Sequence, residues 1–112
     1  MVKSADTWEG RRALTDNPNT SPEVSRGAAR ALMEMNLPSE AAVFFALAGD
    51  KEGLRAIIDQ AVEEGDYFVF QQAASRLGEE IDREKVRALI ASAEKNGRGL
   101  YAEKAAEYLQ NL

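Results

Sequence analysis

The chain has 112 residues, which is one domain by the usual size prior and long enough to bury a single core. It contains no cysteine and no histidine, which excludes disulfides, thiolate nucleophiles, zinc–thiolate sites and the commonest general base. Its formal net charge of -5 argues against non-specific nucleic-acid binding, which depends on neutralising phosphates. No apolar run reaches the roughly 18 residues of a membrane span, and the first residues lack an apolar signal-peptide core. We therefore expect a cytoplasmic protein with no cofactor, nucleic-acid partner or membrane partner. The β-branched residues are sparse beside Ala, Leu, Glu and Arg, which favours an all-α fold.

The first predicted element is a short N-terminal helix over residues 5–15. It would place Trp8, Arg11 and Arg12 at i, i+3 and i+4 of one face. Residues 16–21 follow as a loop of turn formers. Trp8 would either cover the open apolar face of the next hairpin or serve as a binding hot spot.

Three helical hairpins are predicted after this loop, at residues 22–49, 50–78 and 82–112, within one domain that spans residues 1–112. The start of the first hairpin has a strong sequence signal, because Ser21 offers an N-cap hydroxyl and Pro22 fits the first helical position. Each hairpin breaks at a residue that tolerates positive φ. These hinge residues are Asn36, Gly65 and Gly97.

An internal repeat supports the hairpins. Residues 54–78 and 86–110 align at a shift of 32 with eight identities in 25 positions, where roughly two are expected by chance. A hairpin cannot bury its own apolar face, so repeated hairpins are expected to stack on one another. The apolar stripes predicted for the three first helices are Val24, Ala28, Leu32, Met35; Leu54, Ile57, Ile58, Ala61; and Val86, Leu89, Ile90, Ala93. The second helix of the first hairpin, at about residues 39–48, is predicted to be buried on nearly every side.

The second hairpin resembles a tetratricopeptide repeat. Residues 61–67, Ala-Val-Glu-Glu-Gly-Asp-Tyr, look like that family's Gly-Asp-Tyr turn preceded by a small residue. The small residues that the family has early in its second helix match Ala41 and Ala102, whereas Phe70 stands in the second unit. The resemblance implies a right-handed α-α superhelix of about three hairpins. Residues 14–23, Leu-Thr-Asp-Asn-Pro-Asn-Thr-Ser-Pro-Glu, also look like one unit of the leucine-rich variant repeat, and neither resemblance implies a reaction.

A charge pattern recurs at the start of each hairpin. Glu23-Arg26, Glu52-Arg55 and Glu84-Arg87 are i, i+3 pairs, which predicts local ion pairs that favour the helix dipole. The alternative is functional, because tetratricopeptide-like stacks line their concave groove with the first helix of each hairpin. An Arg ladder there would bind a partner peptide or protein with an acidic segment or a C-terminal carboxylate. The partner-binding residues of this hypothesis are Arg26, Arg30, Arg55 and Arg87.

Aromatic residues cluster after the second hinge, at residues 67–70. Core packing explains most of this cluster, and any member left exposed would be an interface anchor. The last helix has no polar capping helix after it in this sequence. Its apolar residues would either pack onto the first helix of the same hairpin or pair with a second copy of the chain: Leu100, Tyr101, Tyr108, Leu109 and Leu112.

Two functions follow from these patterns. The leading one is a non-enzymatic protein-interaction module that binds along the groove of first helices. The alternative is a homo-oligomeric structural or regulatory protein that uses its last hairpin as an interface. An enzyme is not expected, because no nucleophile–base pair or metal constellation can be assembled without histidine or cysteine at a recognisable spacing.

Overall fold

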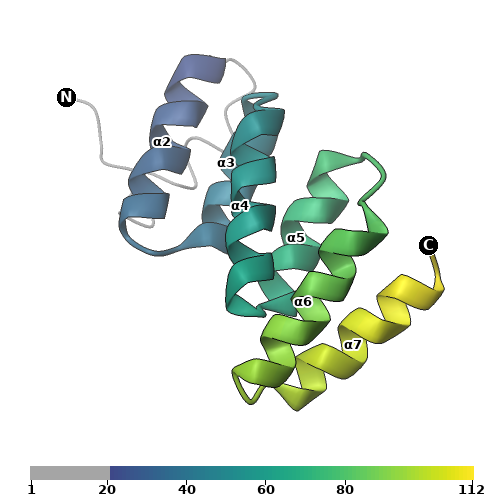
Figure 1. Cartoon of the computed structure of the whole chain (residues 1–112). Coiled ribbons are helices and arrows are strands. Elements are labelled where there is room, and N and C mark those ends of the chain that lie inside the picture. The colour runs from purple at the N-terminus through teal and green to yellow at the C-terminus, as the bar shows by residue number, and fades with distance from the viewer. Residues whose placement is uncertain (1–20) are drawn as a thin grey trace. The chain divides into compact units, whose positions relative to one another are not determined.

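The computed structural model describes residues 21–112, which form six helices and no strand (Figure 1). The predicted all-α class is therefore confirmed, while the predicted N-terminal helix with Trp8, Arg11 and Arg12 lies outside the described residues. The chain divides into two compact units, and the boundary falls inside one helix, after Leu54. The helices are α2 (Pro22–Glu34), α3 (Pro38–Leu47), α4 (Lys51–Glu64), α5 (Tyr67–Leu77), α6 (Arg83–Lys95) and α7 (Gly99–Gln110).

Short polar side chains cap the starts of three helices, and the predicted cap at Ser21 is confirmed. Ser21 caps α2 by accepting a hydrogen bond from the Val24 amide at 3.2 Å, and Asp66 caps α5 by accepting one from the Val69 amide at 3.2 Å. Asp82 does the same for α6, with the Glu84 amide at 2.9 Å. The three predicted hinges all have positive φ: Asn36 at 60°, Gly65 at 72° and Gly97 at 72°.

The first unit holds the α2–α3 hairpin and the first turn of α4. The predicted stripe on α2 is partly wrong, because Val24 is 48% exposed and Met35 is 43% exposed. The residues that α2 buries lie at i, i+3, i+4 and i+7 from Ser25. The buried face of the helix is therefore displaced by about one residue position from the predicted stripe. The buried residues are Ser25, Ala28, Ala29 and Leu32.

Helix α3 is less buried than its composition predicts. Its alanines at 41 and 42 and both phenylalanines are in the core, but Leu47 is 49% exposed. The Phe45 ring lies so close to Gly53 that a Cβ at that position would overlap the ring. The absence of a side chain at Gly53 therefore lets the first turn of α4 approach α3 within this unit.

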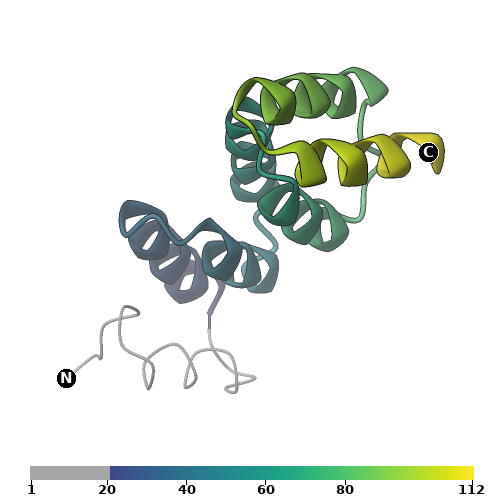
Figure 2. The same cartoon turned by 90° about the horizontal axis from the view of Figure 1, so that it is seen from below.

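The second unit contains the rest of α4 with α5, α6 and α7. Figure 2 shows α6 and α7 running side by side, and α5 also contacts α7. The predicted core positions of α4 and α6 are buried, except that Ile90 remains partly exposed. The buried set in this unit includes Ile57, Ile58, Ala61, Phe70, Ala73, Val86, Leu89, Ala93 and Ala105.

The hinge between α4 and α5 packs directly on the backbone of α6. A Cβ at Gly65 would lie 2.5 Å from the Ala93 backbone nitrogen, so no side chain fits there. Polar contacts surround this approach. The Asn96 side-chain amide donates to the Glu64 carbonyl at 2.9 Å, and Arg98 lies 3.7 Å from Asp66. These contacts fix the α4–α5 hairpin against the end of α6.

Replacing Gly65 by Ala is expected to destabilise the second unit more than the same change at Gly97. Both glycines have φ of 72°, which costs an alanine about 1–2 kcal/mol. Only Gly65 faces a backbone within 4 Å, so Gly65→Ala adds about 1–3 kcal/mol of overpacking. Denaturant unfolding of both variants measures the difference, and equal free energies of unfolding would contradict the close approach.

Candidate binding pocket between α5 and α7

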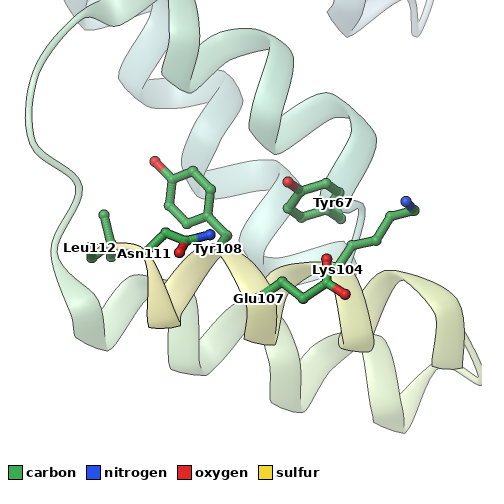
Figure 3. A pocket seen from close by; sticks show the side chains of 6 residues that line it. All are labelled: Tyr67, Lys104, Glu107, Tyr108, Asn111 and Leu112. Carbon is green, nitrogen blue, oxygen red and sulfur yellow. The ribbon is translucent and has the colours of Figure 1, made fainter.

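An aromatic pocket of about 280 Å³ lies between the start of α5 and the end of α7 (Figure 3). Tyr67 is the first residue of α5 and Phe70 comes one turn later on the same face. On α7, Tyr108 shares a face with residues three and four positions away. The lining residues are Tyr67, Lys104, Glu107, Tyr108, Asn111 and Leu112.

The two lining tyrosines pack with a third ring, that of Phe70. The centroids of Phe70 and Tyr108 are 5.3 Å apart at 86°, and those of Tyr67 and Tyr108 are 6.5 Å apart at 71°, both edge-to-face. Such pairs contribute about 0.5–1.5 kcal/mol beyond the area that they bury. Phe70 is fully buried, whereas the two tyrosines are half-buried. The rings therefore hold α5 and α7 together while leaving two phenol groups at the surface.

The two phenols remain protonated at neutral pH. Burial raises the pKa of Tyr67 above the ordinary value of 10.0, and the negative charge of Glu107 raises it further. Burial also raises the pKa of Tyr108, with a smaller contribution from Tyr67. Each hydroxyl can therefore donate a hydrogen bond to a ligand as well as accept one.

The two charged side chains of the pocket, Lys104 and Glu107, point in different directions relative to the tyrosine rings. In Figure 3, Glu107 extends beneath the Tyr67 ring, whereas the Lys104 amine lies beyond Tyr67 and away from Tyr108. The influence of Glu107 on the pKa of Tyr67 agrees with this placement. The fixed charge that acts on the aromatic wall is thus negative.

Most arginines of the predicted Arg ladder do not form the expected ion pairs with the acid three residues earlier. Only Arg87 pairs with the acid three residues earlier, Glu84. Arg26 instead pairs with Asp50 at 3.1 Å, and the same carboxylate caps α4 through the Gly53 amide at 3.1 Å. For Arg26 the acid thus comes from the connection that follows its hairpin, which local i, i+3 spacing does not indicate.

Arg55 repeats this arrangement in the second unit. Its guanidinium contacts both carboxylate oxygens of Glu79, at 2.7 and 3.0 Å, and this acid also follows its arginine by 24 residues. Arg55 and Glu79 line a smaller hollow of about 150 Å³ together with Lys85, which pairs with Asp59 at 2.6 Å. Arg30 is exposed. Most of the predicted ladder is therefore already neutralised by acids of the same chain.

The predicted self-association residues differ in their contacts and exposure. Tyr108 faces α5 as part of the ring cluster, and Leu112 lies at the edge of the pocket. Tyr101 lies under Arg98, whose guanidinium carbon is 5.8 Å from the ring centroid. Leu100 is 64% exposed, and Leu109 is half-buried.

The aromatic cluster after the second hinge leaves Phe68 52% exposed, while Phe70 is buried. Phe68 and Leu100 occupy equivalent positions 32 residues apart, so two apolar side chains are exposed at the start of α5 and of α7. The role of Phe68 as an interface anchor stays a prediction. Sequence reasoning missed the pocket residues Lys104, Glu107 and Asn111, although their spacing around Tyr108 could have indicated a shared face for Lys104 and Asn111.

Within residues 21–112, no group of three or more acidic side chains is arranged to hold a metal ion. Over the same residues, no helix combines the length and the apolar character needed to cross a bilayer. No protein-family model matches the chain, and comparison with curated proteins and with solved structures gives no match. The described fold defines the class: an all-α protein of helical hairpins with an aromatic pocket in its second unit.

Stability is expected to fall at alkaline pH because of the two pocket tyrosines. The folded-state pKa of each is raised, so their contribution to stability is complete below the unfolded pKa of about 10 and is lost as pH rises through the folded pKa. Denaturant unfolding across an alkaline pH series measures this loss, with tyrosinate absorbance reporting ionisation. The double variant Tyr67→Phe/Tyr108→Phe should show a shallower decline than the wild type. An identical decline would contradict the assignment.

Proposed function

We propose that the protein is a non-enzymatic, cytoplasmic protein-interaction module, with degenerate tetratricopeptide-like hairpins, whose second unit binds one side chain of a partner in the pocket between α5 and α7. The observation that carries this proposal is the pair of neutral tyrosines over Phe70, held on two packed helices. The pocket volume of about 280 Å³ lies just below the usual range of small-molecule sites, which suits a single side chain. Its rigid helical support favours binding with little ordering cost.

The chemistry of the pocket favours a basic partner side chain. Aromatic faces attract cations, with about 0.5–2 kcal/mol for a well-placed pair. Glu107 adds a negative charge beneath Tyr67, and the Lys104 amine points away from the ring pair. The phenol oxygens and the Asn111 side chain offer acceptors for the N–H groups of a lysine or an arginine. The net charge of -5 would also speed the encounter with a basic segment.

The arginines of the first helices are the competing candidates for this function. An acidic partner there would have to displace Asp50 from Arg26 and Glu79 from Arg55. Each displacement removes an ion pair that is already formed, so the net gain from a new carboxylate is reduced. Arg87 is likewise already paired, with Glu84, whereas Arg30 is exposed. This comparison favours the pocket as the primary binding surface.

Selection of peptides from a random display library on the immobilised full chain tests the proposal. The pocket predicts enrichment of peptides with a lysine or arginine anchor. Glu107→Lys should reduce the affinity for these peptides by about tenfold or more, because it places like charges together. Glu103→Lys is the matched control, since Glu103 is exposed one turn earlier on α7 and does not line the pocket.

The triple variant Arg26→Ala/Arg55→Ala/Arg87→Ala separates the two surfaces. If the pocket binds the partner, this variant keeps the affinity of the wild type for the selected peptides. Enrichment of acidic peptides whose binding is lost in the triple variant and kept in Glu107→Lys would instead assign binding to the first helices.

A further inference from the structure

The outer face of the α6–α7 hairpin keeps residues that the preceding hairpin uses for stacking. In that hairpin Ile58, Ala74 and Leu77 are buried, at 1%, 7% and 7% exposed. The identical residues 32 positions later are Ile90, Ala106 and Leu109, and all three are only partly buried. The last hairpin therefore carries a helix-docking face without a neighbour among the described residues.

Contacts on α6 show which side of the helix this is. Lys85 binds Asp59 at 2.6 Å and Asn96 binds the Glu64 carbonyl at 2.9 Å, so α4 lies on the side that carries residues 85 and 96. At 3.6 residues per turn, the opposite side carries a separate set of positions. We call this set the outer stripe, and it consists of Arg87, Ile90, Ala91 and Glu94.

The outer stripe is self-complementary in charge. Arg87 and Glu94 are equally distant from the midpoint between Ile90 and Ala91. If two copies of α6 cross antiparallel at that midpoint, each Arg87 meets the Glu94 of the other copy, and each Ile90 packs on the small Ala91 of the other copy. Arg87, Ala91 and Glu94 are exposed, so the backbone need not move. Arg87 would exchange its ion pair with Glu84 of its own helix for one with Glu94 of the other copy. We infer that the outer stripe, with Ala106 and Leu109 of α7, binds a second copy of this chain through a two-fold axis.

The equivalent residues of α4 are not self-complementary in charge. Self-complementarity is therefore specific to α6 and is not a feature of the repeat. The position equivalent to Glu94 is Val62, so α4 has no acid to meet an antiparallel arginine. If this face only packed against another hairpin of the same kind, an apolar residue at position 94 would stabilise the contact better, as Val62 does at the equivalent position of α4. An acid there instead matches the Arg87 of a two-fold partner. The inference goes beyond the pocket between α5 and α7 and does not depend on it.

The size of the face predicts weak association. Helices α6 and α7 have 13 and 12 residues, so each is about 20 Å long. Two adjacent helices of about 10 Å diameter present roughly 400 Å² per copy, which is below the standard size of a stable interface. The dimer should therefore form in the micromolar range and dissociate on dilution.

Sedimentation equilibrium of the full chain over a concentration series tests this inference. The average mass of the wild type should rise towards that of a dimer at high micromolar concentration. Arg87→Glu and Glu94→Arg should each weaken association by about tenfold or more, because every dimer would then contain two like-charge contacts. An equimolar mixture of the two variants should associate again. In the mixed dimer the acid introduced at position 87 of one chain would meet the arginine introduced at position 94 of the other, and the unchanged Glu94 and Arg87 would form the second contact.

Lys95→Glu is the matched control, because Lys95 is exposed on the same helix but lies outside the outer stripe. It should associate like the wild type, and circular dichroism should show equal helix content in all variants. A wild type that stays monomeric at high micromolar concentration would overturn the inference. So would a mixture of the two charge variants that associates no better than either variant alone.

Discussion

The close approach of Gly65 to the backbone of Ala93 is the contact on which the second unit depends. It requires a residue with positive φ and without a side chain, and Gly65 meets both conditions. Because the hinge lies against α6, the Glu64 carbonyl reaches Asn96 and Asp66 comes near Arg98. Helix α5 then starts where Tyr67 and Phe70 meet Tyr108 of α7. The pocket is therefore a consequence of how tightly one hinge packs on the next hairpin.

The same packing explains why charged residues in this unit serve two purposes. Acids that begin a helix or a connection also neutralise an arginine or lysine of a neighbouring helix, as Asp66 does near Arg98 and Glu79 does for Arg55. Exposed pairs of this kind contribute little stability individually, about 0–1 kcal/mol. They also neutralise part of the positive charge of these helices. What remains accessible is the aromatic pocket with Glu107 and the outer stripe of α6.

Much of the local structure can be predicted from the sequence because its causes are local. The hinges Asn36, Gly65 and Gly97 are recognisable because few other residues tolerate positive φ, and all three predictions are confirmed. The core of α4 is recognisable from its helical period. The burial predicted for Val24 and Met35 is wrong, because a helix with apolar residues on several sides does not reveal which side its neighbour covers. The order of three hairpins in a right-handed superhelix stays a prediction.

The candidate sites are harder to predict because they depend on residues far apart in the sequence. Arg26 and Arg55 each bind an acid 24 residues later, and no local rule favours that acid over the one three residues before. The sequence indicates Tyr67 and Tyr108 only separately, as part of an aromatic cluster and as part of a self-association surface. The packing of α5 against α7 brings them together. The outer stripe requires both the repeat and the exposure of α6, and the sequence alone supplies only the repeat.

The most direct test of this account is a nuclear Overhauser measurement on the full chain in solution. The packing predicts cross-peaks between the Gly65 α-protons and the backbone protons of Ser92 and Ala93, because the atoms nearest to the missing Gly65 side chain are those of this backbone. Observation of these cross-peaks would support the contact that positions α5 and the pocket. Assigned resonances for all three residues without any cross-peak between the hinge and α6 would contradict it.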